Sequence, residues 1–153
     1  MLFFTKNDET MNTRHSKIIL IAEDNDDSRQ MLRTFIEMLG YEVIEARDGE
    51  EAINLASSSR PDLILMDLNM PKIDGLTAAA HIRSQPDLCE IPILANSADG
   101  SRGIELFSNI EKFGEGHIDY IPKPISFDEL TYQIDLILGN EQKKILNFKS
   151  AIV

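Results

Sequence analysis

The chain has 153 residues, of which 42% are hydrophobic and 27% are charged, as expected for one globular domain with a sizeable core. Its formal net charge is −11, so nucleic-acid phosphates would repel it and we expect no nucleic-acid partner. The single cysteine excludes an intrachain disulfide, and no apolar run approaches the length of a membrane span, so we expect a cytoplasmic protein without a membrane partner.

The chain divides into three parts by composition. Residues 1–16 are largely polar after a short apolar start, and we expect this segment to be disordered. Residues 17–139 carry the regular hydrophobic patterns and form the one predicted domain. Residues 140–153 form a short tail.

Apolar, strand-like runs alternate with helical patterns five times along the domain. The strands are predicted over residues 17–22, 41–46, 63–66, 91–95 and 118–121. The first run is unbroken, as is typical of a strand buried on both faces. This alternation predicts a parallel sheet covered by helices on both sides.

The ends of the helices are predicted from capping residues and breakers. Asp26 or Asp27 would cap the first helix, Asp48 the second and Ser126 the last, where Glu129 completes a capping box. The third helical pattern covers residues 76–82. Residues 97–103 are rich in breakers and predict a mobile loop before a fourth helical pattern over 104–111.

Polar residues stand where four of these strands end. Asp24, Asp67, Ser97 and Lys123 each come at or just after the end of an apolar run, and Glu23 precedes Asp24. The carboxyl ends of neighbouring parallel strands share one edge of the sheet, where open α/β folds bind ligands. We therefore expect these side chains to meet in one shallow site.

This set of side chains suits phosphoryl transfer to a carboxylate. Two carboxylates about 5 Å apart repel by about 3 kcal/mol at an effective dielectric constant of about 20, so the acidic residues Glu23, Asp24 and Asp67 need a cation. Mg²⁺ prefers such oxygen ligands. Asp67, on the central strand, is the candidate nucleophile, and Lys123 and Ser97 are candidates to stabilise the transferred group.

Each residue alone has a simpler explanation. The Glu23–Asp24 pair and Asp67 could be helix caps or loop residues, Ser97 a turn residue and Lys123 a solvated side chain. Their joint placement at four strand ends favours the functional interpretation.

At these positions the chain resembles the receiver domain of two-component response regulators, over about residues 17–139. The matching stretches are 18–25 (IILIAEDN), 61–71 (PDLILMDLNMP) with 74–75 (DG), 91–95 (IPILA) and 119–124 (DYIPKP). The resemblance implies a flavodoxin-like α/β fold, a doubly wound five-stranded parallel sheet of order 2-1-3-4-5 with five helices.

The resemblance also implies roles for the site residues. Asp67 would accept a phosphoryl group from a histidine kinase or a histidine phosphotransfer protein. Glu23, Asp24, Asp67 and the backbone carbonyl of Asn69 would bind Mg²⁺. Ser97 and Lys123 would contact the phosphoryl group.

Three further residues match positions with regulatory roles in the family. Tyr120, three residues before Lys123, would be a switch aromatic that turns inward as Ser97 moves; its alternative is a half-buried strand residue. Asn69 and Asp99 would tune hydrolysis of the phosphoaspartate, although Asp99 could equally cap the following helix.

Three features depart from the usual family pattern. Glu23 replaces the commoner aspartate, and Asn96 replaces an apolar residue, so the end of the fourth strand is expected to be more hydrated or rearranged. The interval from Ser97 to Lys123 is also longer than usual.

The leading interpretation is a single-domain response regulator, a binding module controlled by phosphorylation rather than an enzyme. Its interaction face, for a downstream protein or a homodimer, would comprise the fourth helix, fifth strand and fifth helix. A shuttle within a phosphorelay is the alternative. A Mg²⁺-dependent phosphatase of the haloacid-dehalogenase type is disfavoured because Asn69, two residues after Asp67, cannot act as a general acid. An FMN-binding flavodoxin is disfavoured because the loop between the first strand and the first helix lacks the Ser/Thr/Gly-rich sequence that binds the FMN phosphate.

Overall fold

The computed structural model describes residues 16–108 and 116–139, in which five strands alternate with five helices. The strands are β1 (Ile18–Ala22), β2 (Glu42–Ala46), β3 (Leu63–Asp67), β4 (Ile93–Ser97) and β5 (Ile118–Pro122). The helices are α2 (Asp26–Met38), α3 (Gly49–Ser59), α4 (Gly75–Ser84), α5 (Gly100–Ser108) and α6 (Phe127–Leu138).

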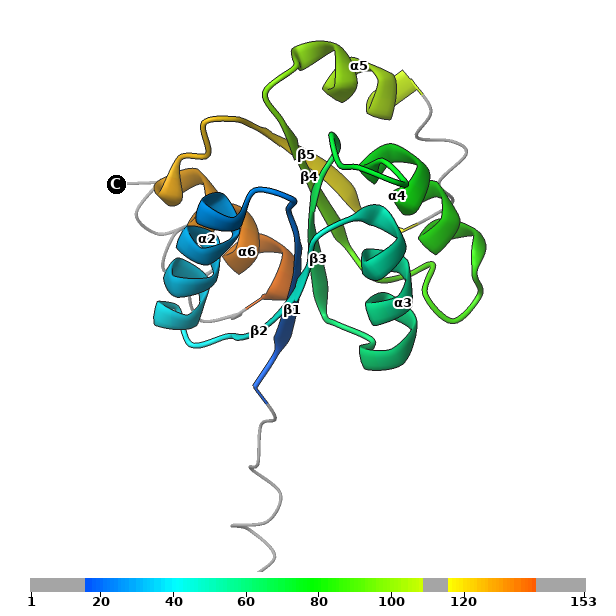
Figure 1. The fold of residues 1–153 in the computed structure, drawn as a ribbon. Coiled ribbons are helices and arrows are strands. Elements are labelled where there is room, and N and C mark those ends of the chain that lie inside the picture. The colour runs from blue at the N-terminus through cyan, green and yellow to red at the C-terminus, as the bar shows by residue number, and fades with distance from the viewer. Residues whose placement is uncertain (1–15, 109–115, 140–153) are drawn as a thin grey trace, which may run out of the picture.

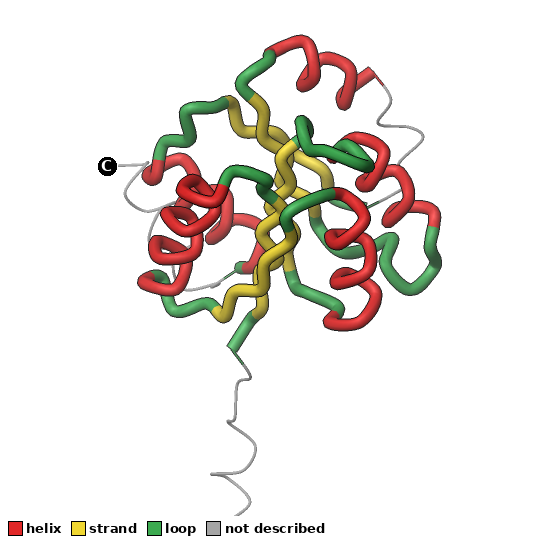
Figure 2. The backbone as a smooth tube through the Cα atoms, in the orientation of Figure 1, coloured by secondary structure: helices red, strands yellow, loops and turns green. Residues whose placement is uncertain are grey.

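The five strands form one sheet in the order β2-β1-β3-β4-β5, and every neighbouring pair is parallel. The predicted flavodoxin-like fold is thus confirmed. The chain reverses its direction of travel across the sheet between β1 and β3, which are hydrogen-bonded neighbours (Figures 1 and 2). In open α/β folds ligands bind outside the carboxyl ends of strands at such a switch point, which points to the ends of β1 and β3.

Helices cover both faces of the sheet. Figure 1 shows α2 and α6 on one side and α3 and α4 on the other. Two buried clusters correspond to these faces: Ile21 and Leu65 lie in the cluster with α2 and α6, whereas Leu20 and Ile64 lie in the other cluster. Leu106 of α5 joins the second cluster. Neighbouring strand residues therefore point to opposite cores, which explains why β1 and β3 lack polar alternation.

Two of the three predicted helix caps are confirmed, and one is wrong. Asp48 and Ser126 cap α3 and α6 as predicted, each accepting a hydrogen bond from a backbone N–H in the first turn. The prediction for α2 is wrong by one residue, because Asn25 is the cap and accepts from the N–H of Ser28 at 2.8 Å. Asp26 and Asp27 occupy the first turn instead, where acidic side chains favour the helix dipole.

The fourth strand and the following helix differ from the sequence-based boundaries. β4 begins at Ile93 and runs through Ser97, and Asn96 keeps regular pairing with Asp67 on one side and Ile121 on the other. The expected rearrangement around Asn96 is absent from this paired region, although its buried side-chain oxygen has no hydrogen-bond partner among the described residues. Helix α5 begins at Gly100, inside the segment predicted to be a loop.

Several predictions fall outside the described residues. These are the disordered segment up to residue 15, the end of the fourth helical pattern over residues 109–111 and the tail over 140–153. Within the described ranges, no helix is both long and apolar enough to cross a membrane.

Gly75 allows α4 to start directly against the end of β3. A Cβ atom at this position would lie 2.0 Å from the backbone oxygen of Asp67. We predict that Gly75→Ala lowers the free energy of unfolding by about 1–3 kcal/mol, the range for overpacking, as measured by urea denaturation.

Gly100, the first residue of α5, provides the matched control, since a Cβ there would have no heavy atom within 4 Å. Gly100→Ala should leave the unfolding midpoint unchanged or raise it slightly. Equal destabilisation by both substitutions would contradict the assigned role of the contact at Gly75.

Candidate functional site

Polar side chains extend one face of the sheet at its carboxyl edge. Ile21, Leu65 and Ile121 belong to the buried cluster beneath α2 and α6. Because side chains alternate along a strand, the residues two positions later point to the same face. Those residues are Glu23, Asp67 and Lys123, so the strand register brings three charged groups together at the end of an apolar layer.

The ammonium group of Lys123 lies between two carboxylates. Its Nζ atom is 3.1 Å from Asp67 Oδ2 and 3.1 Å from Glu23 Oε2. The side chains of Glu23 and Asp67 are only 3% and 5% exposed, whereas that of Lys123 is 25% exposed. A buried carboxylate is costly unless it is paired, so Lys123 compensates both acids at once.

This arrangement shifts the pKa values of two members. Burial, with the adjoining Asp67 carboxylate, raises the pKa of Glu23 from 4.5 to about 7, against the opposing effect of Lys123. For Lys123, burial acts to lower the pKa, but the charges and hydrogen bonds of Asp67 and Glu23 outweigh it and leave the pKa raised. The lysine therefore stays protonated at neutral pH, while one more positive charge at the site would favour ionised Glu23.

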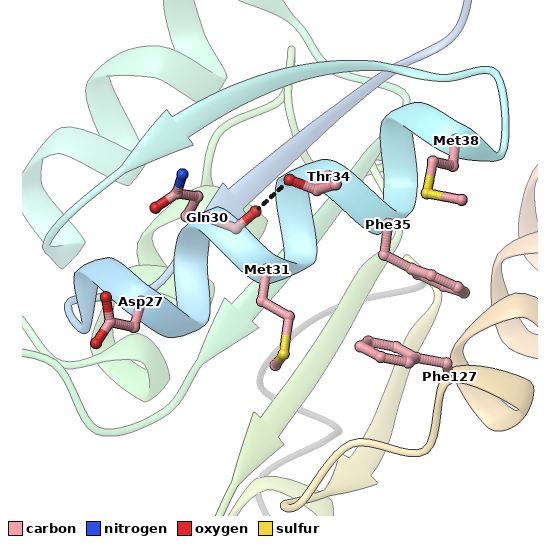
Figure 3. A pocket seen from close by; sticks show the side chains of 7 residues that line it. All are labelled: Asp27, Gln30, Met31, Thr34, Phe35, Met38 and Phe127. Carbon is pink, nitrogen blue, oxygen red and sulfur yellow. Dashed lines mark hydrogen bonds between the residues drawn. The ribbon is translucent and has the colours of Figure 1, made fainter.

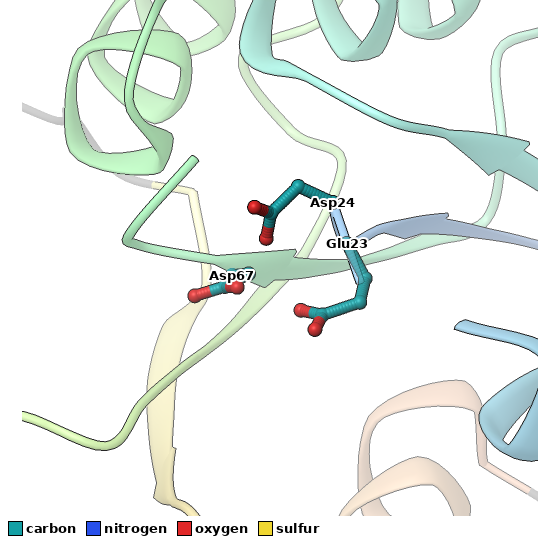
Figure 4. Close-up of side chains that lie close together, drawn as sticks. All are labelled: Glu23, Asp24 and Asp67. Atoms are coloured by element: carbon teal, nitrogen blue, oxygen red, sulfur yellow. The ribbon is translucent and has the colours of Figure 1, made fainter. Parts of the chain in front are cut away.

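Asp24 completes an acidic cluster with Glu23 and Asp67. Figure 4 shows the three carboxylates converging from the end of β1 and the end of β3. One oxygen from each residue lies within 4.8 Å of the others. Asp24 is exposed, whereas Glu23 and Asp67 are buried, so the cluster opens to solvent on the Asp24 side. Hard oxygen ligands with an open side match the preference of Mg²⁺, which retains several waters when bound.

Ser97 connects several parts of the site. Its Oγ atom accepts hydrogen bonds from Asn69 Nδ2 at 2.8 Å and from the N–H of Asp99 at 3.0 Å. Its backbone carbonyl accepts from the N–H of Lys123 and from the hydroxyl of Tyr120, both at 3.0 Å. The end of β4 is thus linked to the loop after β3 and to β5.

Tyr120 is half-buried and already points toward Ser97. Besides the hydroxyl contact, its ring packs so closely on α5 that a Cβ atom at Gly103 would lie 2.9 Å from it. Both features of the sequence interpretation, a half-buried strand aromatic and an inward hydroxyl, occur together. The switch role of Tyr120 stays a prediction.

Asp99 serves the start of α5. Its Oδ1 atom accepts from both the N–H and the hydroxyl of Ser101, at 2.9 and 2.7 Å. The Ser101 hydroxyl and N–H hold the pKa of Asp99 below its usual value. These contacts match the capping alternative, and they explain why a helix starts at Gly100 despite the glycines nearby. A role of Asp99 in hydrolysis stays a prediction.

Arg102 is a site residue that the sequence did not reveal. Its guanidinium donates to Asn69 Oδ1 at 3.1 Å and to Asp74 Oδ2 at 2.9 Å, so α5 is tied to the loop after β3. Asp74 also caps α4 by accepting from the N–H of Thr77 at 2.8 Å. The segment holding Arg102 was predicted to be a loop, and no sequence signal places its side chain over Asn69.

A groove on the flank of α2 lies apart from this chemistry. Figure 3 shows its lining, in which Phe35 of α2 stacks on Phe127 of α6 with ring centroids 4.3 Å apart. The other lining residues all come from α2: Asp27, Gln30, Met31, Thr34 and Met38. Asp27 is the only ionisable residue of that lining, so the groove has no set of groups for phosphoryl transfer.

Comparison with known proteins agrees with this geometry. The family model of the response regulator receiver domain matches residues 19–135. The polar-differentiation response regulator DivK of Brucella anthropi is 38% identical over 125 residues, covering 81% of this chain and 98% of that protein.

Solved structures show the same fold. The receiver domain of sensor histidine kinase PA1611 from Pseudomonas aeruginosa, with a magnesium ion coordinated in its active site cleft, is 32% identical with a TM-score of 0.69, covering 82% of this chain and 99% of that one. The chemotaxis protein CheY4 of Vibrio cholerae is 27% identical with a TM-score of 0.69, covering 80% and 98%. The chain therefore belongs to the response regulator receiver domain family.

Proposed function

We propose that this protein is a single-domain response regulator that accepts a phosphoryl group on Asp67 and then changes its binding to a downstream protein. The observation that carries the proposal is the Lys123 ammonium, which contacts Asp67 and Glu23 beside an acidic cluster open to solvent. The family membership supports a signalling module rather than a metabolic enzyme.

The proposed reaction moves one phosphoryl group. An Asp67 carboxylate oxygen attacks the phosphorus, a P–O bond forms, and the P–N bond to a phosphohistidine breaks as the imidazole nitrogen takes the electron pair and the ring gains a proton from solvent. The donor is a histidine kinase or a histidine phosphotransfer protein. Lys123, already 3.1 Å from Asp67, is positioned to offset negative charge on the phosphoryl oxygens.

The acidic cluster fits Mg²⁺ as the cofactor. Glu23, Asp24, Asp67 and the backbone carbonyl of Asn69 are the proposed ligands, and the magnesium coordinated in the PA1611 receiver domain supports this assignment. When bound, Mg²⁺ would neutralise the cluster and the charge on the phosphoryl oxygens. Lys123, which contacts both Glu23 and Asp67, would offset negative charge beside the cation.

The proposed output face comprises α5, β5 and α6, the fourth helix, fifth strand and fifth helix of the sequence prediction. Apolar side chains are exposed on both helices, with Ile104 of α5 at 69% and Tyr132 of α6 at 53%. Exposed apolar residues next to a switch element suit binding of a downstream protein or a second copy of the chain. A shuttle in a phosphorelay is the second candidate, because the same Asp67 phosphate could pass to another histidine.

We predict that Asp67 is the sole phosphoacceptor. Incubation with acetyl phosphate and Mg²⁺ should add one phosphoryl group by intact mass, and Asp67→Asn should abolish the addition because the amide cannot attack phosphorus. Asp87→Asn is the matched control, since the Asp87 side chain is 78% exposed. Undiminished labelling of the Asp67→Asn variant would overturn the assignment.

We also predict that Mg²⁺ binds more tightly as the pH rises. Glu23, with its pKa raised to about 7, must lose its proton to bind a cation, so affinity should increase about tenfold from pH 6 to pH 8 in calorimetric titrations. Glu23→Gln should bind Mg²⁺ more weakly and with little pH dependence in this range. A wild-type affinity that does not change with pH would contradict a role for Glu23 in metal binding.

The coupling to the output face should depend on Ser97. With Mg²⁺ and beryllofluoride, a mimic of the phosphoryl group, amide exchange in residues 97–125 should change in the wild-type protein and change little in Ser97→Ala, which should still accept phosphoryl groups. Ser84→Ala is the control, because its hydroxyl donates to the carbonyl of His81 at 2.7 Å, within α4. A wild-type response confined to the surroundings of Asp67 would contradict signalling through α5, β5 and α6.

A further inference from the structure

Arg102 joins the first turns of α5 to the loop after β3, which follows the proposed phosphoacceptor Asp67. Its Nε atom donates to Asn69 Oδ1 at 3.1 Å, while its terminal nitrogens donate to Asp74 Oδ2 at 2.9 Å and Glu105 Oε2 at 3.0 Å. The Arg102 side chain is 23% exposed. Asp74 is a firm anchor for this guanidinium, because its other carboxylate oxygen caps α4. Arg102 is therefore held between two helices with its Nε–H aimed at Asn69.

This contact fixes the orientation of the Asn69 amide. A guanidinium has only donors, so the Asn69 atom facing Arg102 has to be the acceptor oxygen. The amide nitrogen then faces Ser97, where Nδ2 donates to Oγ at 2.8 Å. Without Arg102, nothing in the described contacts of the Asn69 side chain would favour this orientation over the reverse, since a serine hydroxyl can accept or donate.

The consequence at Ser97 concerns its proton. A hydroxyl oxygen has two acceptor positions and one proton. Asn69 Nδ2 and the N–H of Asp99 occupy both acceptor positions of Ser97 Oγ. The proton is the one remaining hydrogen-bonding group of this hydroxyl, and a donor is what a negatively charged phosphoryl oxygen requires.

We propose that Arg102 is a positioning residue for phosphoryl transfer at Asp67: by orienting the amide of Asn69 it keeps the Ser97 hydroxyl poised as a donor to the phosphoryl group. The inference rests on the proposed phosphorylation of Asp67 and adds a residue of α5 to that site. It also makes the chemistry sensitive to the position of α5, because Arg102 belongs to this helix.

The steps that should respond are the formation and hydrolysis of the phosphoaspartate. In formation from acetyl phosphate, an Asp67 oxygen attacks phosphorus and the P–O bond to acetate breaks, releasing acetate with the electron pair. In hydrolysis, water attacks phosphorus, the P–O bond to Asp67 breaks, and the carboxylate and inorganic phosphate are regenerated with release of a proton. Both steps place negative charge on the same phosphoryl oxygens. A Ser97 hydroxyl whose proton no longer points to these oxygens should therefore slow both steps.

The test compares rates for Arg102→Met in two backgrounds. Phosphorylation is started with acetyl phosphate and Mg²⁺ and followed by intact mass. Hydrolysis is followed in the same way after acetyl phosphate has been removed, with Mg²⁺ still present. In the wild-type background, Arg102→Met should slow both steps by about 3- to 10-fold, the size expected for one lost hydrogen bond. In an Asn69→Ala background, the same substitution should change the rates less than about 2-fold, because Arg102 acts through Asn69. Arg102→Lys should recover part of the rate.

Arg33→Met is the matched control. Arg33 pairs with Glu37 and Glu45 on the surface at α2 and β2, so its loss changes the net charge equally without touching the site. Its rates should equal those of the wild type. If Arg33→Met slowed both steps as Arg102→Met does, general electrostatics would explain the effect and the proposal would fail.

Two further outcomes would overturn the proposal. Unchanged rates in Arg102→Met would remove any positioning role, and equal slowing in both backgrounds would mean that Arg102 acts without Asn69. A wild-type protein that gains no phosphoryl group would instead refute the proposed function. Should Arg102→Met fail to fold, NMR on the unaltered protein decides: the Arg102 Nε–H should exchange slowly with water, and rapid exchange would contradict the contact with Asn69.

Discussion

The site depends on one electrostatic constraint, the pairing of a single ammonium group with two buried carboxylates. Glu23 and Asp67 lie at the ends of β1 and β3, where the parallel register leaves them almost without contact with water. Burial of two like charges would oppose folding unless a positive charge lay nearby. Lys123, directly after the edge strand β5, supplies it at 3.1 Å from each acid. The central strands are thus joined to β5 through charge as well as through the backbone.

Ser97 extends this constraint to the helical surface. Its hydroxyl and carbonyl oxygens accept four hydrogen bonds, from Asn69, Asp99, Lys123 and Tyr120. A phosphoryl group on Asp67 would compete with Asp67 and Glu23 for Lys123 and would accept the proton of the Ser97 hydroxyl, so it would act on residues whose contacts reach α5 and β5. A two-state response of this kind needs interactions made only in one state, and the Ser97 contacts are where the two states would differ.

The sequence predicted the sheet and the acidic cluster because both depend on local patterns and strand ends. Apolar runs separated by caps determine the strands, and Glu23, Asp67 and Lys123 occupy the positions that follow them. The start of α5 could not be predicted in the same way, since Gly100 and Gly103 read locally as breakers while Asp99 and buried Leu106 stabilise the helix. The sequence did not predict Arg102 as a site residue for a related reason. Its contacts with Asn69 and Asp74 depend on how α5 packs, which no local pattern encodes.

A crystal structure with Mg²⁺ and beryllofluoride would show directly whether Asp67, Lys123 and Ser97 together hold a phosphoryl group. We expect beryllium bonded to an Asp67 carboxylate oxygen, the metal held by the acidic cluster, and fluorine atoms accepting hydrogen bonds from Lys123 Nζ and Ser97 Oγ. Arg102 should still contact Asn69. A structure in which Asp67 carries no beryllium, or in which neither Lys123 nor Ser97 donates to a fluorine atom, would contradict the proposed roles of these residues.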